Sequence, residues 1–91
     1  QTWPLDSDEI VVGREAGHGV IFLNDALVSR HHARITWEGG AFLYRDLSPT
    51  NPTLLGGQPI ENPHRLNDGD RLLVGRTELA FHQVSDDTLR Q

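Results

Sequence analysis

The fold is decided by residues 33–47, which read ARITWEGGAFLYRDL. In the first six residues apolar and polar side chains alternate, and this period of two is typical of a half-buried strand. Gly39-Gly40 follows and predicts a two-residue hairpin turn. A second run of strand-forming residues then covers 41–47. The stretch therefore predicts an antiparallel β-hairpin.

Four more runs of β-type residues flank this hairpin, and turn-forming residues separate them. One turn, Asn67-Asp68-Gly69-Asp70, leads into the apolar run RLLVG. Helical periodicity is missing, and Gly or Pro interrupts the chain at short intervals. We therefore predict an all-β domain built as a β-sandwich. The four runs cover residues 9–14, 19–23, 71–75 and 78–84.

Length and composition limit the class of protein. The chain has 91 residues, enough for one domain with one core. No apolar run is long enough to cross a membrane, and no signal peptide precedes the first strand. Cysteine is absent, which excludes thiol chemistry and is compatible with a cytoplasmic location. The chain begins with Gln1, so we expect a piece of a longer protein: a domain at residues 1–85 and a polar tail or linker at 86–91.

The charge distribution argues against one class of partner. The net charge is −5, which is unfavourable for a general nucleic-acid binder. Only residues 29–53 are net positive, with three arginines against two acidic residues. All eight basic residues are arginine, whose forked guanidinium suits phosphate or carboxylate recognition. A composition bias of the genome explains this usage equally well, and together with the compact loops it favours a bacterial source.

Three stretches carry polar residues that could form a site, because loops at one end of a sandwich gather in space. Gly13-Arg14 ends a strand, where the guanidinium could reach an anion or simply be solvated. Ser29 and His32 lie in VSRHHARI (28–35), just before a strand. We expect the His32 ring to hydrogen-bond the backbone and fix the loop that carries Ser29.

The third stretch is LSPTNPTLL, residues 47–55, between two strand-like runs. Asp46 leads into it and Asn51 lies in its middle. An asparagine amide both donates and accepts, so one side chain can hold the backbone of a ligand at two points. The alternative role of Asn51 is to cap the turn locally.

Metal binding and catalysis are weaker interpretations of these residues. His31 and His32 are adjacent and point to opposite sides of an extended chain, and the other three histidines lack metal-type spacing. Ser29, His32 and Asp46 could form a hydrolase triad, since triads occur in many orders. However, no G-x-S-x-G pattern surrounds Ser29. We expect no metal, no cofactor and no enzymatic activity.

The order and spacing of the motifs are more specific than any one of them. The pattern G-R, S-R-x-H, D-L-x-x-T-N-x-T and L-x-D-G-D-x-L-x-x-G resembles the forkhead-associated (FHA) domain over roughly residues 8–84. The resemblance implies a β-sandwich of about eleven mostly antiparallel strands, whose loops at one end bind phosphothreonine peptides. The motifs are Gly13-Arg14, Ser29-Arg30-His31-His32, Asp46 to Thr53 and Leu66 to Gly75.

The resemblance also implies a role for individual residues. It predicts a partner that contains phosphothreonine and a separate serine/threonine kinase that phosphorylates this partner. It assigns phosphate contacts to Arg14, Ser29, Arg30 and Thr50, the grip on the peptide backbone to Asn51, and structural support of the site to Gly13 and His32.

The chain departs from the family pattern in the third stretch. Pro49 stands where a serine is common, and Pro52 stands where a glycine is common. Proline fixes φ near −65° and favours an extended residue before it, so the loop takes another path or contains a cis peptide at Pro52. We expect phosphothreonine binding with an altered grip by Asn51. The alternative is an FHA-fold scaffold that binds a partner without phosphate or associates with itself.

Overall fold

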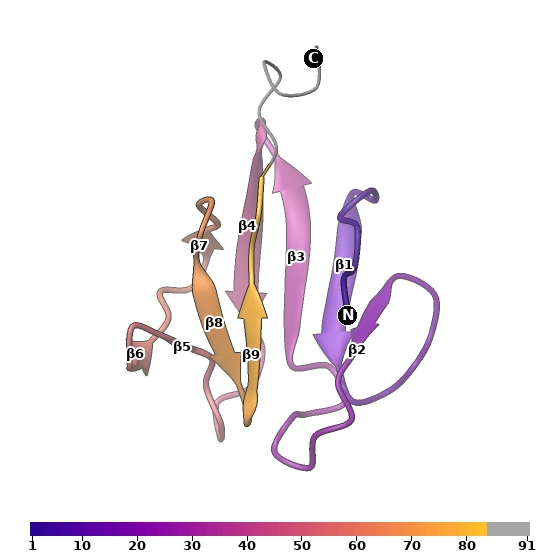
Figure 1. Ribbon diagram of the computed structural model, residues 1–91, viewed down its shortest axis with the longest axis vertical. Coiled ribbons are helices and arrows are strands. Elements are labelled where there is room, and N and C mark those ends of the chain that lie inside the picture. Colours follow the sequence, from indigo (N-terminus) through magenta and orange to yellow (C-terminus); the bar gives the residue numbers. More distant parts are fainter. Residues whose placement is uncertain (84–91) are drawn as a thin grey trace.

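The computed structural model describes residues 1–83, which form two β-sheets and no helix (Figure 1). The larger sheet has the order β2-β1-β3-β4-β7 and the smaller sheet the order β6-β5-β8-β9. Strands β1 and β2 pair in parallel, and the other neighbours are antiparallel. The strands are β1 (Glu9–Gly13), β2 (Val20–Phe22), β3 (Ala33–Glu38), β4 (Ala41–Asp46), β5 (Leu54–Leu55), β6 (Gln58–Pro59), β7 (His64–Arg65), β8 (Arg71–Val74) and β9 (Thr77–Ala80).

The predicted central hairpin is confirmed. Strands β3 and β4 pair along their whole length, from Ala33 opposite Asp46 to Glu38 opposite Ala41. Gly39 and Gly40 form the turn with φ of 59° and 83°. Both angles lie in the left-handed region that a two-residue turn between twisted strands requires and that glycine adopts at little cost.

The strand count and the bounds of the last strand differ most from the prediction. Residues 1–83 contain nine strands, where the resemblance implied about eleven. Strands β5, β6 and β7 have two residues each, too few to show an alternating pattern. The run predicted at 78–84 forms strand only over Thr77–Ala80, and its last residue lies outside the described residues, as does the predicted tail at 86–91. Within residues 1–83, no helix is long and apolar enough to cross a membrane.

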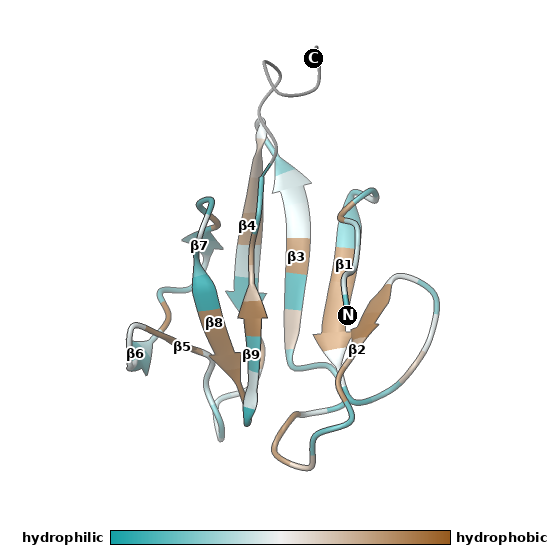
Figure 2. Ribbon diagram, in the orientation of Figure 1, coloured by the Kyte–Doolittle hydropathy of each residue, from teal (hydrophilic) through white to brown (hydrophobic). Residues whose placement is uncertain are grey.

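The core lies between the two sheets and draws on both. Hydrophobic residues concentrate in the strands, most clearly in β1, β2 and β8 (Figure 2). On β8 the side chains alternate strictly, with Leu72 and Val74 buried and Arg71 and Leu73 exposed. The buried apolar residues are Ile10, Val12, Ile21, Leu23, Val28, Ala33, Ile35, Tyr44, Ile60, Leu66, Leu72 and Val74.

The register of the larger sheet gathers the predicted site at one end of the sandwich. Val12 pairs with Ala33, and Ala33 pairs with Asp46. The end of β1, the start of β3 and the end of β4 therefore lie side by side, at the bottom of Figure 1. The turn between β8 and β9 reaches the same end. All three polar stretches of the sequence are thus brought together by strand pairing.

Candidate functional site

Gly13 allows two backbone segments to come unusually close. A Cβ atom at this position would overlap the carbonyl oxygen of Arg30 and lie 2.7 Å from its carbonyl carbon. Glycine is required here because of this close contact and not because of the backbone angle, since Gly13 does not have a positive φ. The backbone N–H of Arg14 donates to the carbonyl of Ser29 at 3.0 Å, which ties the end of β1 to the loop before β3.

The guanidinium of Arg14 is held by one of its three nitrogens. Its Nε donates to the carbonyl of Val28 at 3.0 Å, and its two Nη groups make no hydrogen bond within residues 1–83. No carboxylate lies within 4.0 Å of it in this part of the chain, whereas Arg45 and Arg71 are paired with glutamates. Arg14 therefore presents an oriented, uncompensated positive charge at the protein surface.

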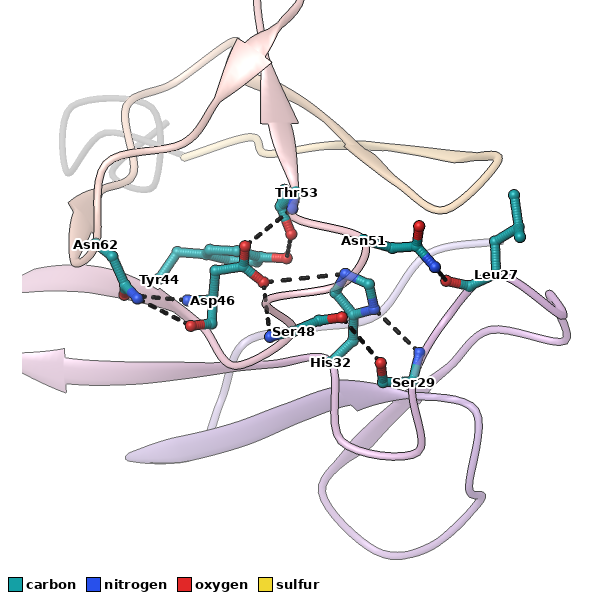
Figure 3. A network of polar contacts seen from close by, with 9 residues as sticks. All are labelled: Leu27, Ser29, His32, Tyr44, Asp46, Ser48, Asn51, Thr53 and Asn62. Atoms are coloured by element: carbon teal, nitrogen blue, oxygen red, sulfur yellow. Dashed lines mark hydrogen bonds and ion pairs between the residues drawn. The ribbon is translucent and has the colours of Figure 1, made fainter.

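His32 shapes the loop that carries Ser29. The backbone N–H of Ser29 donates to His32 Nδ1 at 3.0 Å, and the imidazole is completely buried (Figure 3). Because Nδ1 accepts a hydrogen bond, the neutral ring carries its proton on Nε2. That Nε2 has no hydrogen-bond partner among the described residues and lies 3.9 Å from Asp46 Oδ1. Burial lowers the pKa of His32 below its usual 6.5, and the Asp46 carboxylate opposes the shift only in part.

This pKa predicts a pH dependence of stability. His32 stays neutral in the folded state below pH 6.5, where the unfolded chain already binds a proton at this residue. The contribution of His32 to the free energy of unfolding is therefore complete above pH 6.5. It is lost as the pH falls toward the folded-state pKa, with a slope of at most about 1.4 kcal/mol per pH unit. Urea unfolding of wild type and His32→Gln between pH 5 and 8 checks this. The difference between the two should shrink as the pH falls, and a constant difference would contradict it.

The hydroxyl of Ser29 does not contact the His32 ring. It lies 2.9 Å from the hydroxyl of Ser48, and the accepting ring nitrogen is already used by the Ser29 backbone. Ser29, His32 and Asp46 therefore lack the hydroxyl-to-imidazole hydrogen bond of a hydrolase triad. Ser48 did not stand out in the sequence, because a serine in a loop beside proline is common.

Asp46 organises the third stretch from the end of β4. Its Oδ2 accepts the N–H of Thr53 at 3.0 Å, and its Oδ1 accepts the N–H of Ser48 at 3.3 Å. Asn62 braces Asp46 from behind, accepting its N–H at 3.2 Å and donating to its carbonyl at 2.9 Å. No local pattern points to Asn62, because its partner lies sixteen residues away in the chain. The carboxylate closes residues 48–53 into a compact loop (Figure 3).

The base of this loop is fixed by a buried hydroxyl pair. Tyr44 and Thr53 are both fully buried, and their hydroxyls lie 2.7 Å apart. Burial raises the pKa of the Tyr44 phenol, so it remains protonated and able to donate. The pair connects β4 to the residue just before β5.

Tyr44→Phe is expected to lower the free energy of unfolding by about 1–3 kcal/mol, because it leaves the buried Thr53 hydroxyl without a partner. Thr53→Val should have a similar cost. Since the double variant leaves neither hydroxyl unsatisfied, Tyr44→Phe/Thr53→Val should lose clearly less than the sum of the two. Urea unfolding of the four proteins measures this coupling, and additive losses would contradict the pairing.

Asn51 and its neighbour Thr50 are exposed in this loop, and Arg30 is exposed in the loop before β3. Asn51 Nδ2 donates to the carbonyl of Leu27 at 3.3 Å, which is long for a hydrogen bond. The peptide bond before Pro52 is trans. Asn62–Pro63 is the cis bond among the described residues, so the cis alternative for Pro52 is wrong.

Asp25 is a further residue that supports the site. Its carboxylate accepts the N–H of Leu27 at 2.9 Å, the N–H of Arg76 at 2.7 Å and the hydroxyl of Thr77 at 2.8 Å. These bonds, the one from Leu27 first, lower the pKa of Asp25. The loop before β3 is thereby fastened to the turn between β8 and β9. Arg76 and Thr77 lie more than fifty residues from Asp25, so the sequence could not reveal these two contacts.

Comparison with known proteins agrees with this geometry. The sequence pattern of the FHA domain matches residues 10–75. The chain belongs to the FHA family. It is 38% identical over 77 residues to the glycogen accumulation regulator GarA of Mycolicibacterium smegmatis, covering 85% of this chain and 48% of GarA. It is 35% identical over 80 residues to the FHA domain-containing protein FhaA of Mycobacterium tuberculosis, covering 87% of this chain and 15% of FhaA.

Solved FHA structures share the fold. An FHA domain from a study of phosphothreonine-dependent FHA interactions superposes with a TM-score of 0.78 at 31% identity, covering 92% of this chain and 88% of that one. The structure of Mycobacterium tuberculosis EmbR with a low-affinity phosphopeptide gives a TM-score of 0.77 at 32% identity, covering 87% of this chain and 21% of that one. The chain spans less than half the length of the curated relatives GarA and FhaA. FHA domains are protein-interaction modules.

A wide groove of this FHA domain lies away from the loops described above. It is an open groove of about 980 Å³ between the sheets, and none of the predicted site residues lines it. Its apolar walls include Trp3, Leu5, Trp37, Phe42 and Phe81. A phosphate group needs convergent N–H and O–H donors more than volume, and the loop end supplies these donors. Within residues 1–83, no group of three or more metal-ligating side chains occurs.

Proposed function

We propose that this FHA domain binds phosphothreonine peptides through the loops at the end of β1, before β3 and after β4. The observation that carries the proposal is the pairing of Arg14 and Ser29. The two Nη groups of Arg14 are free within residues 1–83, and the Arg14 backbone is bonded to that of Ser29. A guanidinium and a hydroxyl are matched donors for a phosphate that carries about −1.5 to −2 charge at pH 7.

The net charge of −5 does not oppose this binding. Distant surface charges are screened beyond about 8 Å in physiological salt. Arg14 and Arg30 have no carboxylate within 4.0 Å among residues 1–83, so no close ion pair neutralises either guanidinium. Arg30 and Thr50 are exposed, and in this proposal both side chains add phosphate contacts.

Asn51 grips the peptide backbone in this proposal. Its long, exposed bond to the Leu27 carbonyl can be exchanged for a bond to the peptide at little cost. The trans peptide at Pro52 supports a loop that keeps Asn51 at the surface. Pro52 also has a use of its own, because it forms one wall of a small cleft beside Asn51.

The cleft has a volume of about 210 Å³ and receives an apolar side chain of the bound peptide. Leu27 and Leu73 are each 38% exposed there, which leaves apolar surface for a ligand to cover. The cleft is lined by Leu27, Asn51, Pro52, Leu54, Leu73 and Gly75.

In this function the domain recruits a partner that a separate serine/threonine kinase has phosphorylated, and it performs no chemistry itself. The parent protein would act in kinase signalling in the cytoplasm. FhaA, GarA and EmbR are similar in sequence to this chain, and the structure of EmbR has been solved in complex with a low-affinity phosphopeptide. These likenesses support the proposal.

An oriented phosphothreonine peptide library, with its unphosphorylated twin as control, tests the proposal. Saturable binding to the phosphorylated library alone is expected, with a preference for apolar residues near the phosphothreonine. Leu73→Ser should weaken that preference while leaving phosphate discrimination intact. Equal binding to the two libraries would overturn the proposal.

The groove between the sheets favours a second candidate, a phosphate-independent interaction. Trp37 is 43% exposed at its wall. A partner bound there would bind regardless of phosphorylation and would be lost in Trp37→Ser but retained in Arg14→Ala. Loss of binding in Arg14→Ala with full binding in Trp37→Ser would instead identify a domain that binds phosphothreonine through the loop end.

A further inference from the structure

Ser48 is placed to act on the phosphate-binding hydroxyl of Ser29. Ser48 is only 4% exposed, and its hydroxyl has one hydrogen-bond partner within residues 1–83, which is Ser29 Oγ at 2.9 Å (Figure 3). Ser29 is more accessible than Ser48. One hydroxyl thus lies behind the other, as seen from the surface where the phosphate would bind.

The positions of both serines are fixed by hydrogen bonds to the ring and the backbone of His32. The N–H of Ser29 donates to His32 Nδ1, and the N–H of Leu47, just before Ser48, donates to the carbonyl of His32 at 2.8 Å. The N–H of Ser48 is occupied by Asp46 Oδ1. The short distance between the hydroxyls is therefore built into the site by bonds that do not involve the hydroxyls themselves.

The chemistry of phosphate decides which hydroxyl donates. In the free domain either can donate to the other. A phosphate dianion offers only acceptors, so Ser29 must give its single hydrogen to the phosphate. Ser29 Oγ can then only accept from Ser48, whose hydrogen has no other acceptor in the described part of the chain.

We infer that Ser48 is a positioning residue for phosphate recognition, which donates to Ser29 Oγ and so directs the hydrogen of Ser29 toward the phosphate. This inference rests on the proposed function. A hydroxyl that accepts one hydrogen bond becomes a better donor of another, because the bonds in a chain polarise each other. When the Ser48 hydroxyl donates to Ser29 Oγ, the Ser29 hydroxyl no longer donates inward to Ser48.

A double-mutant cycle with Ser29 tests this role. Affinity for one phosphothreonine peptide is measured by fluorescence anisotropy for wild type, Ser48→Ala, Ser29→Ala and the double variant. Ser48→Ala is expected to weaken binding about 3- to 10-fold, the range for one neutral hydrogen bond. In the Ser29→Ala background the same change should have almost no effect. A residue that merely stabilised the loop would cause the same loss in both backgrounds.

Two further variants test whether the loss of affinity is specific to the Ser48 hydroxyl. Ser48→Cys nearly keeps the volume of the side chain but replaces the hydroxyl with a weak donor, so it should lose affinity as Ser48→Ala does. Ser7→Ala removes an exposed hydroxyl in the N-terminal segment and should leave binding unchanged.

Three results would overturn the inference: no loss in Ser48→Ala, equal losses in both backgrounds, or full affinity in Ser48→Cys. Each of them leaves the proposed function intact as long as wild type still prefers the phosphorylated peptide over its unphosphorylated twin. A wild-type domain that binds the two peptides equally would overturn the proposed function, and the role of Ser48 with it.

Discussion

Replacing Arg14 with alanine is expected to weaken phosphothreonine-peptide binding by about a hundredfold or more. The free Nη groups can form two charge-assisted hydrogen bonds with the phosphate, each contributing about 1.5–3 kcal/mol. Together they amount to at least about two factors of ten in the dissociation constant. Arg14→Lys should fall between wild type and Arg14→Ala, because it keeps the charge and loses the fork. Isothermal titration calorimetry with one phosphopeptide measures all three.

Arg71→Ala is the matched control for this change. It removes the same unit of charge from an exposed arginine, and its partner Glu78 is also exposed. Arg71 begins β8 at the opposite end of the strand from the turn that approaches Asp25. Its loss should change the affinity less than twofold. If Arg71→Ala weakened binding of the phosphopeptide as much as Arg14→Ala, general electrostatic attraction would explain the binding. Arg14 would then not be the phosphate-binding residue.

Gly13→Ala should be the most destabilising single-methyl substitution in this part of the molecule. The new Cβ would overlap the Arg30 carbonyl, and this obstacle is backbone that cannot rotate away as a flexible side chain would. Overpacking of this kind costs about 3 kcal/mol or more, equivalent to a fall in Tm of at least about 12 °C for a domain of this size. Thermal unfolding followed by circular dichroism measures this fall in Tm. Peptide affinity should fall as well, because separating β1 from Arg30 displaces both Arg14 and Ser29.

Gly17→Ala provides the control for glycine replacement as such. Gly17 has no positive φ, and the nearest atom to its added Cβ would be a Val20 methyl at 3.6 Å, an ordinary contact. Its Tm should change by no more than about 3 °C, within the usual range of a surface substitution. A small effect at Gly13 would mean that the loop before β3 can move away from β1, and that the site is less rigid than the account requires.

The long strands and the turn at Gly39-Gly40 could be predicted because their signals are local. Alternation in residues 33–38 and the glycine pair after it depend only on neighbours in the sequence, and the structure follows them. The two-residue strands β5, β6 and β7 could not be predicted in the same way. Their pairing is imposed by longer strands beside them, such as β8 beside β5.

The residues of the site also divide into those with a local sequence signal and those that act only through tertiary contacts. The motifs selected Arg14, Ser29, His32 and Asn51 because residue type and spacing are visible in the sequence. Nothing there could show that Asp25 fastens one loop to a turn fifty residues later. Ser48 and Asn62 were missed for the same reason, since each acts through a tertiary contact of a common polar residue. Pro52 was expected to change the path of the loop or to follow a cis peptide bond; the bond is trans, and Pro52 lines the small cleft beside Asn51, a contact that its sequence neighbours could not show.

The most direct test of the central claim is a titration of ¹⁵N-labelled domain with a phosphothreonine peptide, followed by amide chemical shifts. The account predicts that the largest shifts fall on Arg14, Ser29, Arg30 and Asn51, and that Gly69, in the turn between β7 and β8, stays unchanged. The unphosphorylated peptide should cause no saturable shift. Equal shifts with both peptides, or shifts centred on Trp37 and Phe81 in the groove, would contradict phosphothreonine recognition at the loop end.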